Sequence, residues 1–172
     1  IRFHLENESN LSAIGEFENS KDLLKNSVVI NVHSGIGAGI IINEKLYTGF
    51  EGRAGEIGHM VLVPKGKKCP CGNKGCFEQY CSIPALLENF NEKSKIKVKT
   101  VKELCDLYNS KNKDALEIIE NNIDLMSIGI TNVFNLFAPD NIFIHSELIT
   151  YIPEYLTLIN KKIKSTFSKD VT

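Results

Sequence analysis

One short segment of the sequence holds a histidine and three cysteines at close spacing: His59, Cys69, Cys71 and Cys76. Imidazole nitrogen and thiolate sulfur are ligands that zinc prefers, and four of them make a closed tetrahedral site of the structural kind. Gly72 and Gly75 lie in the same segment, where glycine gives the positive φ and close backbone approach that a chain wrapped around an ion needs. The sequence therefore predicts one structural zinc ion in a loop over residues 59–78.

The cysteine count is consistent with metal ligation. Five cysteines are present, and an odd number outside a secretory context favours thiolate ligands over a disulfide framework. Cys81 and Cys105 fall in segments of helical character, which predicts small buried side chains, although Cys81 is a substitute candidate for a ligand. The alternative is a set of reduced thiols in a lysine-rich surface loop, but exposed thiols packed so closely are prone to oxidation.

Composition limits the class of protein. A chain of 172 residues with 42% hydrophobic and 24% charged residues is expected to form one globular domain, residues 1–172. The net charge of −1 provides no basic face for nucleic acid. The longest apolar run, residues 35–42, is far too short to cross a bilayer, and no signal peptide opens the chain, so we expect a cytoplasmic protein without membrane contact. The first residue is Ile1 rather than methionine, and we take the sequence to be a fragment.

The elements that must position the zinc loop can be predicted from hydrophobic periodicity. Short apolar or β-branched runs predict strands at residues 1–5, 28–32, 39–43, 46–48, 60–63 and 141–145, the last of them buried. Residues 35–39 would be a tight connection between the second and third strands. Residues 28–48 should form an antiparallel meander. Recurrence at three or four residues predicts helices at residues 9–18, after Pro84, and at 98–108, 114–137 and 153–167. The expected fold is a mixed α/β domain with helices packed on a sheet.

The zinc segment also carries the strongest family resemblance. The sequence resembles the ROK family of sugar kinases and sugar-responsive repressors at Gly55-Glu56-Ile57-Gly58-His59 and at Cys69-Pro70-Cys71-Gly72-Asn73-Lys74-Gly75-Cys76-Phe77-Glu78. Further similarity occurs in segments 6–16, 35–40 and 132–139. The resemblance implies an actin-like or ribonuclease-H-like fold of two lobes, with this chain as the C-terminal lobe. The family's first lobe, the N-terminal winged helix that its repressors carry, and the family's last segment would then be missing.

The resemblance also implies a sugar site. Monosaccharide-binding residues would be Asn7, Glu8, Glu56, His59 and Glu78. Carboxylate, amide and imidazole groups suit this role because each sugar hydroxyl is both a donor and an acceptor. The zinc ion would hold His59 and the loop that bears Glu78 in place. Without the motif, Glu56 and Glu78 would be interpreted as solvated loop charges.

This sequence departs from the pattern of the family's kinases in three segments, and these differences favour a regulator over a kinase. The acid after Asn7, which is an aspartate base in the kinases, is Glu8, and a base displaced by about 1 Å can cost around a hundredfold in rate. The hairpin that commonly has Gly-Thr-Gly has His33-Ser34-Gly35, and the late Gly-Gly pair is His145-Ser146. Asn-Glu in the first element resembles the xylose-type repressors. We therefore expect a sugar-sensing regulator that requires zinc.

Two other functions remain as alternatives. One is a glucokinase-like ATP-dependent sugar kinase, in which Glu8 is the base, ATP and magnesium are bound, and Gly35, Gly37 and Gly39 contact nucleotide. The other is a purely structural zinc domain. For the regulator we expect a homo-oligomer, dimer or tetramer, a monosaccharide effector, and DNA contact only through an N-terminal domain that is not in this chain.

Overall fold

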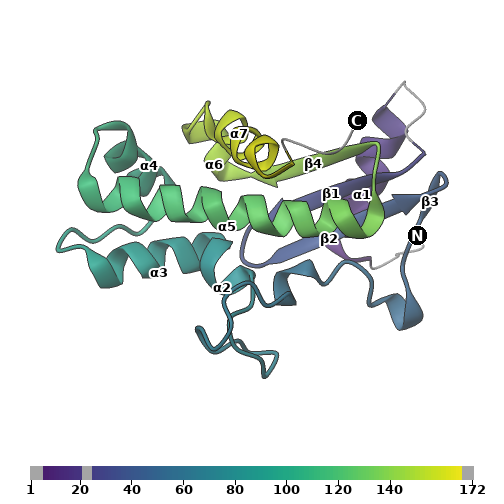
Figure 1. Ribbon diagram of the computed structural model, residues 1–172, viewed down its shortest axis with the longest axis horizontal. Helices are drawn as coiled ribbons and strands as arrows, with labels where there is room; N and C mark the ends of the chain where they lie inside the picture. Colours follow the sequence, from purple (N-terminus) through teal and green to yellow (C-terminus); the bar gives the residue numbers. More distant parts are fainter. Residues whose placement is uncertain (1–5, 21–24, 168–172) are drawn as a thin grey trace, which may run out of the picture.

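The computed structural model describes residues 6–20 and 25–167, so the strand expected at residues 1–5 lies outside these ranges. A four-stranded mixed sheet has the order β3-β2-β1-β4 (Figure 1). Its strands are β1 (Ser27–Val32), β2 (Ile36–Ile42), β3 (Lys45–Leu46) and β4 (Asn141–Ser146). The first three pair antiparallel, which confirms the predicted meander, and β4 pairs parallel to β1.

The strand β2 begins earlier than the sequence indicated. Residues 35–39 were expected to form a connection, but β2 starts at Ile36, and the turn before it is closed by the His33 N–H donating to the Gly35 carbonyl. Helix α1 (Glu8–Asn19) explains why glycine lies inside this strand. A Cβ on Gly39 would lie 2.0 Å from the Ser9 carbonyl oxygen, so only glycine allows α1 to pack this closely.

The turn between β2 and β3 is where it was expected. Asn43 and Glu44 both have positive φ, at 51° and 64°. Two left-handed residues in a two-residue hairpin match the twist of the strands that they join. Glycine is the usual second residue of such a turn, so Glu44 adopts a conformation that is uncommon for its type.

Helices cover both faces of the sheet. Figure 1 shows the long helix α5 (Lys113–Phe137) crossing in front of β1 and β2, with α1 behind them. All six residues of β1 are buried. Val28, Ile30 and Val32 belong to the core cluster that contains α5 residues, whereas Val29 clusters with Ala13 of α1. A strand buried on both faces is expected to be β-branched throughout, and this explains the Val-Val-Ile run.

Shorter helices complete the structure: α2 (Glu78–Cys81), α3 (Ile83–Lys93), α4 (Val101–Asn109), α6 (Glu147–Tyr151) and α7 (Tyr155–Phe167). The predicted helices are confirmed, with ends shifted by a few residues. Side-chain caps set several starts, including the capping box of Thr100 with Glu103 that begins α4 three residues after the predicted residue 98. No described helix has the length and apolar character needed to span a membrane.

Two predictions about strands need correction. Residues 60–63 do not form a strand; within the described residues only Val61 pairs there, in a single bridge with Cys76. Residues 50–76 are instead loop with two 3-10 turns, Phe50–Gly52 and Ile57–His59. The strand at residues 141–145 exists as β4, but it is partly exposed rather than buried, because it lies at the edge of the sheet.

Candidate metal centre and adjoining pocket

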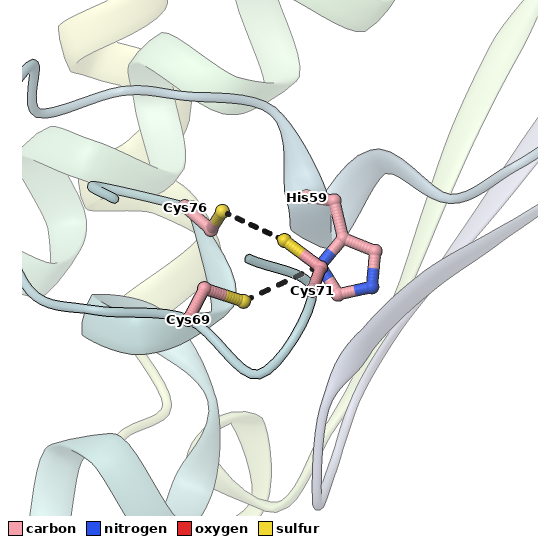
Figure 2. Close-up of side chains that lie close together, drawn as sticks. All are labelled: His59, Cys69, Cys71 and Cys76. Atoms are coloured by element: carbon pink, nitrogen blue, oxygen red, sulfur yellow. Dashed lines mark hydrogen bonds between the residues drawn. The ribbon is translucent and has the colours of Figure 1, made fainter. Parts of the chain in front are cut away.

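The four predicted ligands lie together in the structure (Figure 2). The ligand atoms of His59, Cys69, Cys71 and Cys76 are all within 4.8 Å of one another. Cys69 Sγ is 3.6 Å from His59 Nδ1, and Cys71 Sγ is 3.6 Å from Cys76 Sγ. The cluster has the composition and closeness needed to hold a metal ion.

These separations can be compared with a tetrahedral site. Zinc bonds of about 2.3 Å to sulfur and about 2.0 Å to nitrogen, at tetrahedral angles, place a nitrogen and a sulfur about 3.5 Å apart and two sulfurs about 3.8 Å apart. The observed 3.6 Å distances from Cys69 to His59 and from Cys71 to Cys76 are close to both values. Two of the six ligand pairs thus have the separations of a tetrahedral zinc site, and all six lie within 4.8 Å.

Local backbone structure brings the ligands together. His59 ends a 3-10 turn, and the cysteines come from a folded-back loop in which Lys68 bridges Lys74 and the Cys69 N–H donates to the Asn73 carbonyl. Gly75, with φ of 82°, packs so closely that a Cβ there would lie 1.7 Å from the Val63 carbonyl oxygen. Glycine at this position is thus required by the fold of the loop, as the sequence suggested.

Burial and hydrogen bonding differ among the thiols. Burial raises the pKa of Cys69 to about 12 and also raises the pKa of Cys76. A backbone N–H at Asn73 lowers the pKa of Cys71, whose side chain is exposed. Because metal binds thiolate, an ion entering this cluster must displace protons from the two buried thiols. Cys81 and Cys105 are buried elsewhere and are not part of the cluster, as predicted for small core side chains.

A small polar pocket of about 220 Å³ adjoins the metal cluster. Its walls are the first turn of α1, the turn from β1 to β2, and the segment before His59. Four of the five predicted sugar-binding residues line it: Asn7, Glu8, Glu56 and Glu78. The fifth, His59, does not line the pocket but contacts two residues that do, because its ring lies 3.8 Å from Glu56 and 3.5 Å from Glu78.

The pocket residues differ in how firmly they are held. Asn7 caps α1, with its Oδ1 accepting from the Ser9 N–H, and this bond leaves its amide NH₂ available to donate. Glu78 is only 18% exposed and lies 3.3 Å from Cys69 Sγ. Glu8 and Glu56 are 74% and 58% exposed, with His33 and His59 as their respective neighbours at 3.8 Å. The pocket thus combines fixed donors and acceptors with two exposed carboxylates.

The glycines predicted to contact nucleotide have other structural roles. Gly37 and Gly39 face Ser9 of α1, where added Cβ atoms would clash at 2.7 Å and 2.0 Å. A Cβ on Gly35 would lie 3.3 Å from Oε2 of Glu78, which is a tight contact rather than a clash. Packing against α1 therefore accounts for Gly37 and Gly39.

Some residues of the site were not identified from the sequence. Ser9 lines the pocket, and Gln79 donates toward Cys69 Sγ at 3.7 Å and toward Glu78 at 3.4 Å. The position of Gln79 directly after Glu78 was the available signal. His145 was noted only as a departure from a glycine pair, whereas its Nε2 lies 2.9 Å from Glu16 Oε1 and joins the end of β4 to α1.

A larger cavity occurs on the other side of the sheet. A groove of about 650 Å³ lies between α5, β4 and α7, and its walls include Ile142, Ile144 and Ile159. Its lining is largely aliphatic and lacks the convergent polar groups that a sugar needs. The smaller polar pocket beside the metal cluster is therefore the better candidate for a sugar site.

The chain is similar to known proteins both in sequence and in fold. The chain is 37% identical to a xylose repressor from Bacillus spizizenii over 163 residues, which is 94% of this chain and 42% of that protein. The chain thus spans less than half the length of this relative. In the solved structures, a ROK hexokinase from Thermus thermophilus matches with a TM-score of 0.85 and 23% identity, covering 93% of this chain and 54% of that one.

A ROK family transcriptional regulator, described as a homologue of the E. coli MLC protein, matches with a TM-score of 0.82 and 27% identity. The match covers 92% of this chain and 43% of that one. The mixed sheet with packed helices is thus the actin-like fold of the ROK sugar kinases, as expected. The ROK family model matches residues 1–171, and the chain belongs to the ROK family.

Proposed function

We propose that this chain is the effector-binding lobe of a sugar-responsive ROK transcriptional regulator, which binds a monosaccharide in the polar pocket and one structural zinc in the adjoining cluster. The observation that carries the proposal is the shared wall of the two sites, where Glu78 lines the pocket and also lies 3.3 Å from Cys69 Sγ. A metal that orders the cysteine loop would therefore order one side of the sugar pocket.

The chemistry of the pocket supports a neutral sugar as ligand. Three carboxylates, Glu8, Glu56 and Glu78, offer acceptors to sugar hydroxyls, and the Asn7 amide offers a donor. No lysine or arginine is among the described residues that line the pocket. An anionic ligand such as a sugar phosphate would meet repulsion from the three carboxylates, without a cation to offset it.

Regulator function is favoured over kinase function by the relatives and by one contact. Several similar proteins are named xylose repressors, at 33% to 38% identity. At the junction where the family's kinases have a glycine pair, His145 is anchored to Glu16 by the 2.9 Å contact. A side chain held in this way is unable to move aside for a nucleotide without losing this contact with Glu16.

The expected partners follow from this proposal. A regulator of this kind would reach DNA through a separate domain, act in the cytoplasm and assemble as a dimer or tetramer. The chain spans 38% to 43% of the xylose repressors that it matches, which leaves room for such a domain in a protein of their length.

Calorimetry on the full-length protein tests the sugar site. D-xylose, D-glucose and N-acetylglucosamine should be titrated into wild type and Glu56→Ala, each loaded with zinc, with D-glucose 6-phosphate as an anionic comparison. We expect one neutral sugar to bind, Glu56→Ala to weaken it, and the phosphate not to bind. Absence of binding by every sugar, or equal binding by the variant, would disprove the site.

The kinase alternative is tested by ADP release with the bound sugar and by an ATP titration. We expect neither turnover nor ATP binding. Turnover in the usual enzyme range of about 1 to 10³ s⁻¹ would replace the regulator proposal with a kinase.

A further inference from the structure

Two histidines contact helix α1 from the ends of neighbouring strands. His33 directly follows β1, and its Nε2 lies 3.8 Å from Oε1 of Glu8 in the first turn of α1. His145 belongs to β4, which pairs parallel to β1, and its Nε2 lies 2.9 Å from Oε1 of Glu16, about two turns further along the helix. Of the two histidines, only His33 lines the sugar pocket.

The backbone of His33 is fixed on both sides. Its N–H donates to the Gly35 carbonyl, and its carbonyl accepts from the N–H of Ile83 at the start of α3. Glu8 has a helical backbone, but its side chain is 74% exposed. Among the described residues, the only ion-pair partner of Glu8 is His33. The anchored ring is therefore able to restrict the exposed carboxylate.

The distance between His33 and Glu8 makes their contact depend on charge. At 3.8 Å the two atoms are too far apart for a hydrogen bond but close enough for an ion pair. A neutral ring gains little from this contact, whereas a protonated ring is attracted to the carboxylate. The 2.9 Å contact of His145 with Glu16 is a hydrogen bond that a neutral ring can also make. Because imidazole changes charge between about pH 5 and 8, the contact of His33 should respond to pH near neutrality.

The charged groups around His33 are acidic. Helix α1 contributes Glu8, and the other carboxylates of the pocket are Glu56 on the loop and Glu78 on α2. Next to the end of β1, Glu147 follows β4 in the first turn of α6. The first turn of α3 has no titratable side chain. Of the described residues that line the pocket, His33 is the one that can become positively charged. A single positive charge does not cancel three carboxylates, so the pocket still disfavours an anionic ligand.

We propose that His33 is a further positioning residue of the pocket: its protonated ring holds the Glu8 carboxylate toward the sugar, so that sugar binding takes up a proton and strengthens toward lower pH. The ring faces Oε1 of Glu8, which leaves Oε2 to accept from a sugar hydroxyl. A sugar that replaces water in the pocket lowers the local dielectric constant and strengthens the attraction between His33 and Glu8. The inference rests on the proposed function and adds a pH dependence to the same site.

Calorimetry on zinc-loaded full-length protein tests this coupling, with the sugar that binds most tightly among D-xylose, D-glucose and N-acetylglucosamine. Titrations at about pH 6 and about pH 8, each in two buffers with different heats of ionisation, give the Kd and the number of protons taken up. His33→Gln removes the group that can be charged. His145→Gln is the matched control, because His145 also contacts α1 and its side chain is 36% exposed against 40% for His33. Circular dichroism verifies that both variants are folded.

Ion pairs between partly exposed groups are weak, so we expect wild type and His145→Gln to bind sugar about 2- to 5-fold more tightly at the lower pH, with uptake of protons. His33→Gln should show neither effect. An unchanged pH dependence in His33→Gln would overturn the proposal and assign the titration to another group. Binding by wild type that does not depend on pH would also overturn it, but would leave the sugar site in place. Absence of sugar binding by wild type at both pH values would overturn the proposed function and this inference with it.

Discussion

The metal loop, residues 50–76, and the core formed by α5 and the sheet are stabilised in different ways. In the core, side chains such as Ile30 and Ile119 are fully buried and regular hydrogen bonding fixes the backbone. The loop has two 3-10 turns and two isolated bridges, and few of its apolar side chains are buried. Burial thus determines the shape of the core, whereas glycine geometry and the ligand cluster determine the shape of the loop. Separate substitutions should be able to disrupt one without the other.

Removal of a ligand should have the largest effect, and it should be confined to the loop. Cys76→Ser replaces a fully buried thiol of the cluster with a poor zinc ligand. Loss of a residue that only hydrogen-bonds to a metal ligand typically lowers metal affinity by about 10- to 100-fold. Loss of a ligand itself should therefore lower the affinity by more than that. Competition with a zinc-sensitive dye measures the affinity, and circular dichroism should show an unchanged helical signal.

Cys105→Ser is the control for this experiment, because Cys105 is equally buried but lies outside the cluster. It should keep wild-type zinc affinity. Stoichiometric zinc on Cys76→Ser with unaltered affinity would show that Cys76 is not a ligand.

A cavity in the core should lower the stability of the fold and leave zinc affinity unchanged. Ile119→Ala in α5 removes a fully buried side chain and is expected to lower the free energy of unfolding by about 2–5 kcal/mol. Zinc affinity should not change, because the loop does not depend on this side chain. Urea denaturation and the zinc competition assay measure the two quantities. A parallel fall in zinc affinity would mean that the two regions are a single cooperative unit.

Gly129→Ala tests the place where the two regions meet. A Cβ on this α5 residue would lie 2.6 Å from the ring of Phe77, which directly follows the ligand Cys76. Overpacking should lower stability by about 1–3 kcal/mol and also weaken zinc binding, because the displaced ring shifts its neighbour. The control is Gly15→Ala in α1, where an added Cβ meets nothing within 4 Å. This control should be neutral or stabilising by up to about 1 kcal/mol in thermal denaturation; equal effects of both substitutions would contradict the prediction.

Asn7→Asp should have the smallest effect, and only on the pocket. Aspartate caps a helix as well as asparagine, so α1 should keep its stability. The variant loses the amide donor, and one hydrogen bond of about 0.5–1.5 kcal/mol corresponds to roughly a 2- to 10-fold loss of sugar affinity. Calorimetry and thermal denaturation measure the two effects. Unchanged sugar affinity would show that the Asn7 amide makes no contact with the ligand.

The sequence predicted the long helix and the clustering of His59 with three cysteines well, because each has a strong local signature. The apolar residues of α5 repeat over 25 residues, and His59 with the three cysteines forms a complete ligand set. The start of β2 was missed because Gly37 and Gly39 resemble a turn until α1 is placed against them. The supposed strand at 60–63 has strand-like residues, but Val61 pairs only with Cys76.

Features that depend on how side chains and strands are oriented relative to their neighbours could not be predicted from the sequence. The spacing placed Glu56 and Glu78 near His59, but nothing local indicates which ring nitrogen faces which carboxylate. The exposure of β4 also could not be predicted, because its apolar residues are the same whether a strand lies at the edge or in the centre of a sheet. Tertiary packing decides both features.

The close approach of α1 to β2 limits how the protein can respond to a ligand. The Ser9 carbonyl and the Ala13 methyl occupy the space where a side chain on Gly39 would be, and packed interfaces of this kind do not deform continuously. Small sliding steps of α1 along the strand are therefore disfavoured. We expect a ligand that pulls on Asn7 or Glu8 to move α1 and β2 together, because the two elements share this packed contact.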